Sequence, residues 1–98
     1  MKIEQDILNW HRETFPRATD YAVHKKFAEE INELRESLDH DIISVANEIA
    51  DVFISGTAFL DRHGISLERV IREKFDIVKQ RDYKSMPEDE HGDRVRIR

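Results

Sequence analysis

Four acidic side chains stand in two pairs with the same spacing, and together they could bind a divalent metal ion. Glu30 and Glu33 lie three residues apart in FAEEINEL, and Glu48 and Asp51 lie three apart in ISVANEIADVFISG. On a helix, this spacing puts both members of a pair on one side. The second pair interrupts an apolar segment, and an ionised carboxylate that is buried alone is costly. Glu48 and Asp51 therefore need a partner.

Basic partners for these acids are scarce, because Arg35 is the only Lys or Arg between Lys26 and Arg62. Four carboxylates in one place repel each other, and their pKa values rise unless a cation is present. Mg²⁺ and Mn²⁺ prefer oxygen ligands such as carboxylates. An ExxE pair alone usually marks a solvated helix face. Two such pairs on neighbouring elements favour a metal site instead.

The spacing of the apolar residues predicts four helices that would position these acids, over residues 3–14, 21–38, 41–63 and 67–81. Pro16 ends the first helix, and Asp20 is the expected N-cap of the second. Gly64 closes the third helix and Ser66 caps the fourth. The tight turn at Asp39 and His40 predicts an antiparallel hairpin, so the two acidic pairs should converge. The fold class is all-α, with four helices.

The third helix is apolar nearly all round, with the acids on one narrow strip. A helix of this kind must be buried nearly all round, and three other short helices can hardly do that within one chain. We therefore expect a homo-oligomer, a dimer or a tetramer, in which this helix packs across a subunit interface.

The composition describes one charge-rich domain of 98 residues, with 39% hydrophobic residues, 38% charged residues and a net charge of −5. We assign residues 1–84 to the domain and 85–98 to a loose polar tail. The acidic balance argues against binding a nucleic-acid polymer, which requires a basic face. The absence of cysteine excludes disulfides and thiol nucleophiles. No uninterrupted apolar run approaches the length of a membrane span, and the start MKIEQDIL lacks the apolar core of a signal peptide. We expect a cytoplasmic protein that has no membrane partner.

The acidic motif also resembles a known family. FAEEINEL, followed fourteen residues after Glu33 by NEIADVF, is similar to the EExxE…ExxD signature of the MazG-like nucleotide pyrophosphohydrolases, the all-α NTP pyrophosphatase superfamily. The resemblance runs from about residue 7 to residue 81. The opening LNWHRETFP resembles the branch of dATP/dGTP pyrophosphohydrolases.

The resemblance implies hydrolysis of nucleoside triphosphates, here purine dNTPs, to the monophosphate and pyrophosphate. The reaction would use two or more Mg²⁺ or Mn²⁺ ions, and metal-activated water would attack the α-phosphorus. The implied metal ligands are Glu30, Glu33, Glu48 and Asp51, and either Glu33 or Glu30 would also accept the proton. Glu29 would support these ligands or bind metal at times, and Asn47 stands where many members have another acid.

The substrate's phosphates and base also have candidate partners. The resemblance implies that Lys74 and Arg81 hold phosphates. Lys26 is expected on the same side as Glu30 and could join them, although a plain surface lysine is the more common case. Trp10, Phe15 and Phe27 could stack on the base, and for Trp10 and Phe27 a place in the core is the alternative. The five histidines form no HxxxH pair, which argues against a zinc site.

Two other functions fit the same residues. One is an inactive helical interaction module, in which basic residues of a partner would pair with Glu48 and Asp51. The other is a phosphoribosyl-ATP pyrophosphohydrolase, which ranks lower because of the LNWHRETFP opening.

Overall fold

Helices account for most of the chain in the computed structural model, which describes residues 2–94. The elements are α1 (Lys2–Thr14), α2 (Asp20–Ser37), α3 (Ile42–Asp61), α4 (Leu67–Lys79) and a short 3₁₀ turn, η1 (Tyr83–Ser85). The β-structure within the described residues is one isolated bridge between Glu88 and Arg94. The predicted all-α class with four helices is confirmed, and each predicted helix end lies within two residues of the observed one.

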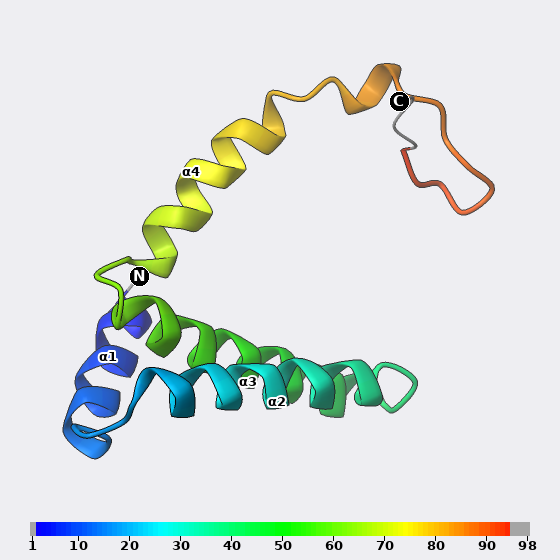
Figure 1. Ribbon diagram of the computed structural model, residues 1–98. Helices are drawn as coiled ribbons and strands as arrows, with labels where there is room; N and C mark the ends of the chain where they lie inside the picture. The colour runs from blue at the N-terminus through cyan, green and yellow to red at the C-terminus, as the bar shows by residue number, and fades with distance from the viewer. Residues whose placement is uncertain (1, 95–98) are drawn as a thin grey trace.

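Helices α2 and α3 form the predicted antiparallel hairpin, and they run side by side over most of their length (Figure 1). The predicted N-cap of α2 is wrong by one residue. Thr19 has extended backbone dihedrals, and its Oγ1 accepts a hydrogen bond from the Ala22 N–H at 3.1 Å. Asp20 is instead the first helical residue, and its carboxylate pairs with Arg62 at 2.6 Å. This ion pair ties the start of α2 to the end of α3.

The two helices approach closely at Gly56, which is buried in α3. A Cβ atom at this position would lie 3.3 Å from Cε1 of Phe27 on α2. The Phe27 ring also packs against Phe59, and the Phe59 ring stacks on His24 at a centroid distance of 4.2 Å. The glycine therefore lets an aromatic layer form between α2 and α3.

Helix α1 packs across the C-terminal half of α3. Its Leu8 is buried, and Arg12 donates two hydrogen bonds to the Asp61 carboxylate at 2.6 and 3.1 Å. Helices α1, α2 and α3 thus pack together, as the figure shows (Figure 1).

Helix α4 does not join this group and projects away from it (Figure 1). Gly64 ends α3 with φ of 70°, and the Gly64 and Ile65 N–H groups bond to the carbonyls of Asp61 and Leu60. Ser66 then caps α4, as predicted, by accepting from the Arg69 N–H. No residue of α4 is buried. One chain therefore packs three of its four helices.

The exposed part of α3 is unusually apolar. Ile42, Ile43, Ile49 and Phe53 are 75%, 69%, 49% and 42% exposed. By length and composition, α3 is long and apolar enough to cross a membrane, contrary to the expectation from uninterrupted runs. It carries Glu48 and Asp51 in its middle, which favours the core helix of an assembly over a membrane span.

The segment after α4 forms local hydrogen bonds and an ion pair as far as Arg94, and the loose tail stays a prediction. The Arg94 guanidinium pairs with Glu88 at 2.8 Å and donates to the Met86 carbonyl at 3.0 Å. The Asp89 carboxylate accepts from the N–H groups of His91 and Asp93, both at 2.9 Å. These bonds close a small turn on itself. Residues 95–98 of the predicted tail lie outside the described part, and the domain boundary at residue 84 stays a prediction.

Candidate functional site

Three of the four predicted metal ligands converge where α2 and α3 lie side by side. Glu30 and Glu33 come from α2 and Glu48 from α3, and each can offer an oxygen atom within 4.8 Å of the others. Glu30 is buried with 5% exposure, Glu48 is half-buried and Glu33 is exposed. The antiparallel hairpin therefore produces the predicted cluster, open to solvent on the Glu33 side.

Two buried oxygen atoms in this cluster have no hydrogen-bond partner among the described residues. They are Oε2 of Glu30 and Oε2 of Glu48. Buried polar atoms nearly always have a hydrogen-bond partner in folded proteins, and burying a charged group without one costs free energy. Because all the available donor atoms are carboxylate oxygens, the site fits a hard divalent cation such as Mg²⁺ or Mn²⁺.

Lys26 provides the one counter-charge that the structure describes at this cluster. Its Nζ lies 2.6 Å from Oε1 of Glu30, one helical turn away, and this hydrogen bond raises the pKa of Lys26. The predicted position of Lys26 on the same side as Glu30 is confirmed. One ammonium group still faces three carboxylates, so a negative excess of about two remains to be neutralised.

The excess of negative charge raises the pKa of Glu33. The charge of Glu30 raises the pKa of Glu33 first, followed by a hydrogen bond between the two carboxyl groups. Partial desolvation and the charge of Glu48 raise it further, while Lys26 opposes the shift. Glu33 thus titrates above its ordinary range when no cation is bound.

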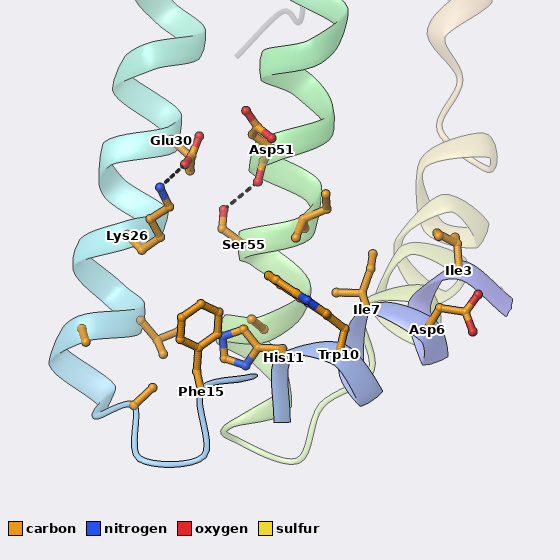
Figure 2. A pocket seen from close by; sticks show the side chains of 15 residues that line it. Ile3, Asp6, Ile7, Trp10, His11, Phe15, Lys26, Glu30, Asp51 and Ser55 are labelled. Carbon is orange, nitrogen blue, oxygen red and sulfur yellow. Dashed lines mark hydrogen bonds and ion pairs between the residues drawn. The ribbon is translucent and has the colours of Figure 1, made fainter. Parts of the chain in front are cut away.

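Asp51, the fourth predicted ligand, lies outside the set of mutually close oxygens. It is exposed on α3, and its carbonyl accepts a hydrogen bond from the Ser55 hydroxyl at 3.0 Å (Figure 2). Figure 2 shows Asp51 and Ser55 across from Lys26 and Glu30. Glu29 and Asn47, next in sequence to two of the ligands, are both exposed. The predicted metal role of Asp51 and the supporting roles of Glu29 and Asn47 stay predictions.

An apolar groove of about 900 Å³ begins beside the acids and runs between α1, α2 and α3. Lys26, Glu30 and Asp51 line the end nearest the cluster. Trp10 and Phe15 line the groove farther along, with their rings edge to face at a centroid distance of 5.6 Å (Figure 2). The volume lies within the range of small-molecule sites. An aromatic wall next to a cation site suits a ligand that has both a planar ring and phosphates.

The predicted aromatic residues divide into two groups. Trp10 and Phe15 are 53% and 48% exposed and line the groove, which favours the base-contact interpretation of Trp10 over the core. Phe27 packs between α2 and α3 instead and is not part of the groove lining. Its predicted contact with a base has no support from this placement.

Three polar groove residues were missed by the sequence reasoning, namely Asp6, His11 and Ser55. Partial burial lowers the pKa of His11, while Asp61 acts in the opposite direction. Asp6 and His11 flank the stripe of Ile3, Ile7 and Trp10 at about 100° per residue. Their position at the border of an apolar stripe was the sequence signal that could have identified them as groove residues.

The predicted phosphate ligands Lys74 and Arg81 are not brought to the acids by their own chain. Lys74 lies on α4, which projects away from the hairpin (Figure 1). Arg81 follows the end of α4, and its Nη1 donates to the Tyr83 hydroxyl at 3.1 Å. Of the three predicted phosphate-binding residues, only Lys26 lies at the acidic cluster within one chain.

Comparison with known proteins gives one family match, which covers residues 3–76 and is described as phosphoribosyl-ATP pyrophosphohydrolase. Neither the curated proteins nor the solved structures contain a match to this chain. The matched region includes the four acids and Lys74 but ends before Arg81. It does not single out the dATP/dGTP branch that the opening of the sequence resembles. Since the match spans well over half of the residues, the chain belongs to the phosphoribosyl-ATP pyrophosphohydrolase family, within the MazG-like all-α NTP pyrophosphatase superfamily.

Proposed function

We propose that this protein hydrolyses a purine nucleoside triphosphate between its α- and β-phosphates, releasing the monophosphate and pyrophosphate with the help of Mg²⁺ or Mn²⁺. The observation that carries the proposal is the convergence of three carboxylates, two of them with a buried oxygen that lacks a partner, at the end of an aromatic groove. The family implies a pyrophosphohydrolase, which agrees with this arrangement.

The acids would hold the ions, and the chain would position the phosphates. Glu30, Glu33 and Glu48 would bind two or more divalent ions, with Asp51 as the fourth ligand. Such ions neutralise triphosphate charge and make a bound water more acidic. Lys26 would contact phosphate at the same end of the groove, because its ammonium group already lies 2.6 Å from the Glu30 carboxylate.

Glu33 is the better candidate for the proton acceptor. A general base needs access to solvent and a pKa near the working pH. Glu33 is exposed, and neighbouring carboxylates raise its pKa. Glu30 is buried, and its Oε1 already pairs with Lys26 at 2.6 Å. We therefore favour Glu33 over Glu30 for this role.

The base would lie in the groove against Trp10 and Phe15. An aromatic wall favours any flat base, and two purine substrates fit the remaining observations. The family description favours phosphoribosyl-ATP, whereas the LNWHRETFP opening favours dATP or dGTP. Both substrates contain a purine triphosphate, so the same site and the same bond cleavage serve either. We further propose a cytoplasmic homo-oligomer, a dimer or a tetramer, because so much of α3 is apolar and exposed.

The test is a substrate panel with pyrophosphate release as the readout. The protein with Mg²⁺ or Mn²⁺ is offered phosphoribosyl-ATP, the four dNTPs and the four NTPs. We expect pyrophosphate from at least one purine triphosphate, and no turnover after metal removal. Equal rates on dCTP and dUTP would contradict the purine preference.

A matched pair of variants connects turnover to the acids. Glu48→Gln should weaken Mn²⁺ binding at least tenfold and abolish turnover, since it removes one charge that binds the metal. Glu36→Gln, an exposed acid on the same hairpin, should change neither. If a folded wild-type protein is silent with every substrate, the inactive interaction module becomes the better interpretation.

A further inference from the structure

A second, smaller cavity adjoins the groove at the C-terminal ends of α1 and α3. Its volume is about 230 Å³, several times the roughly 30 Å³ that one water molecule occupies in the liquid. Its lining residues are His11, Arg12, Phe15, Pro16, Asp61 and Arg62. Two of them, His11 and Phe15, also line the groove. A ligand that stacks on Phe15 therefore lies next to the second cavity.

Two guanidinium groups of this cavity are held in place and still have free donors. Arg12 uses Nε and Nη2 for the Asp61 carboxylate, at 3.1 and 2.6 Å. Arg62 uses Nε for Asp20 at 2.6 Å and Nη1 for the Ala18 carbonyl at 2.5 Å. An arginine has five N–H donors, and Nη1 of Arg12 and Nη2 of Arg62 have no hydrogen-bond partner in the described part of the chain. Each side chain can therefore donate to a ligand without giving up its ion pair.

The charge balance at this end of the groove is positive, in contrast to the acidic cluster. Arg17 lies in the loop between α1 and α2, is exposed, and forms no ion pair with the residues that the structure describes. Arg12, Arg17 and Arg62 outnumber by one the two aspartates with which Arg12 and Arg62 pair. The whole chain has a net charge of −5, so a local positive excess beside a cavity favours an anionic ligand.

The arginines and the acids lie at opposite ends of the groove. Arg62 is bonded to Asp20 in the first turn of α2, ten residues before Glu30. A rise of 1.5 Å per residue separates these two positions by about 15 Å along the helix axis. Figure 2 shows Phe15 at the end of the groove opposite Glu30 and Asp51. A purine triphosphate with its phosphates at the acids and its base on Phe15 therefore points the far side of the base toward the arginines.

We infer that Arg12 and Arg62, with Arg17 beside them, form a second phosphate subsite, which binds a phosphate monoester carried on the far side of the purine base. The planar fork of an arginine suits phosphate oxygens. The two aspartates already hold the guanidinium groups in position, so less side-chain entropy is lost on binding. The place of the subsite relative to the substrate rests on the proposed function, whereas its affinity for phosphate does not.

The subsite separates the two kinds of purine substrate that the groove fits. Phosphoribosyl-ATP carries a ribose phosphate on its adenine ring in addition to the triphosphate, whereas dATP and dGTP end at the base. Only phosphoribosyl-ATP can occupy the acids and the arginines together. The arginines should therefore contribute more to the binding of phosphoribosyl-ATP than to the binding of dATP.

Paired kinetics with phosphoribosyl-ATP and dATP test the subsite. Arg62→Gln should raise the KM for phosphoribosyl-ATP at least about tenfold more than the KM for dATP, the loss expected for one hydrogen bond between charged groups. The kcat should change little, because the cleaved bond lies at the other end of the groove. Arg17→Gln breaks no ion pair and should shift the ratio of the two KM values in the same direction, so the test survives if Arg62→Gln fails to fold.

Arg69→Gln, on the polar side of α4, is the control and should leave the ratio as in wild type. An unchanged ratio in the folded variants at Arg62 and Arg17 would overturn the subsite. Hydrolysis of dATP without any hydrolysis of phosphoribosyl-ATP would also overturn it, and that result would leave the proposed function intact.

Ribose 5-phosphate tests the subsite without turnover, so it still decides if no substrate is hydrolysed. In protein freed of metal with EDTA, the acidic end of the groove repels phosphate and the arginine end attracts it. Nuclear magnetic resonance should show saturable shifts of the Arg12 and Arg62 Nε–Hε signals at millimolar ribose 5-phosphate, whereas ribose should cause none. Arg69, on α4, is the internal control. Shifts no larger at Arg12 and Arg62 than at Arg69, or equal shifts with ribose, would overturn the inference.

Discussion

The carboxylate of Glu33 has charged neighbours of both signs, and their balance decides how a metal ion would change its pKa. Two carboxylates, Glu30 and Glu48, raise its pKa, and one ammonium group, Lys26, lowers it. A divalent cation would reverse the sign of this environment, because opposite charge favours the ionised form. Metal-free and metal-bound protein should therefore respond differently to pH.

Glu33→Gln should stabilise the metal-free protein at neutral pH. With a folded pKa above the unfolded one, Glu33 costs nothing at low pH, where it is protonated in both states. The cost grows as pH rises through the raised pKa, since the folded chain must then give up a proton that it holds more tightly. The variant should melt at a higher temperature than wild type at pH 7 without metal, and at the same temperature near pH 4.

The metal dependence and a matched acid provide the controls for Glu33→Gln. Added Mn²⁺ should raise the melting temperature of wild type more than that of the variant. Glu36→Gln, exposed on the same helix, should behave like wild type in both conditions. A Glu33→Gln variant that is less stable than wild type at pH 7 without metal would show that Glu33 is not repelled.

Trp10→Ala should weaken substrate binding more than it slows the chemical step. Stacking of a base on an aromatic ring contributes about 1–3 kcal/mol, which corresponds to a rise in KM of about 5- to 150-fold. The kcat should change little, because Trp10 lies along the groove away from the carboxylates. Steady-state kinetics measure both constants. Tyr21→Ala, an aromatic residue with 75% exposure, is the control.

Trp10 also allows a direct binding measurement, since it is the only tryptophan in the chain. A non-hydrolysable purine triphosphate should change its fluorescence in wild type. An unchanged spectrum at saturating ligand, together with an unchanged KM for Trp10→Ala, would show that the base does not bind against Trp10 in the groove.

The acidic pairs were predictable from sequence because helical spacing and a tight turn fix which side chains meet. That reasoning placed Glu30, Glu33 and Glu48 together, and the structure confirms the cluster. It did not foresee that Lys26 would pair with Glu30 at 2.6 Å, although the two are four residues apart. It also could not separate Asp51 from the other three acids, because a difference of about 60° around a helix lies within the scatter of a helical wheel.

Among the elements, α4 shows how one side chain can fix the direction of a whole helix. Glu4 accepts hydrogen bonds from the first turn of α4, from the Ser66 hydroxyl and the Glu68 N–H. The Glu68 N–H is one of the backbone groups for which a helix N-terminus offers no partner within the helix. The carboxylate thus joins α1 to α4 across more than sixty residues of sequence.

Glu4→Ala should loosen α4 without unfolding the hairpin. Losing a partly buried cap costs about 1–3 kcal/mol, and the loss should concentrate in Leu67–Lys79. Hydrogen exchange should speed up there and stay slow in the middle of α2 and α3. Glu13→Ala, on the exposed side of α1, is the control. Equal exchange rates in α4 of both variants would show that Glu4 does not hold the helix.

Sequence predicted the elements better than their placement. Caps such as Ser66 and the closing glycine Gly64 are local signals, and the structure confirms both. The N-cap of α2 was displaced because Thr19 and Asp20 are both good caps, and only Thr19 has the extended backbone that a cap needs. The apolar residues of α4 were expected to face inward, but Val70, Ile71 and Phe75 are 39%, 39% and 60% exposed. Periodicity shows which face of a helix is apolar and not whether its own chain covers that face.

The whole molecule is extended and leaves much apolar surface exposed. Its longest dimension is 49 Å, and apolar faces of both α3 and α4 meet solvent. Exposed patches of this extent are typical of interfaces rather than of stable monomers. The proposed homo-oligomer accounts for these exposed faces, because a second copy would cover them.

Stability should therefore depend on protein concentration. If the folded chain exists only as a dimer, each tenfold increase in concentration adds about 1.4 kcal/mol to the free energy of unfolding per dimer. For a dimer of this size the melting temperature should rise by about 3–6 °C per tenfold increase, which calorimetry or circular dichroism from 1 to 100 µM (roughly the accessible range) can measure.

A charge on the apolar stripe of α4 should lower the melting temperature over the whole concentration range. Phe75→Glu places a carboxylate on the apolar stripe of α4. In the proposed oligomer a second copy would cover this stripe and the charge would lose its hydration at a cost, so the melting temperature should fall at every concentration. Glu73→Lys, on the polar side of α4, changes charge without touching that stripe and should keep the slope of wild type. A wild-type melting temperature that is the same at both ends of the range would mean that α4 is stable without a second copy. In that case the apolar stripe of α4 would be exposed in the native monomer.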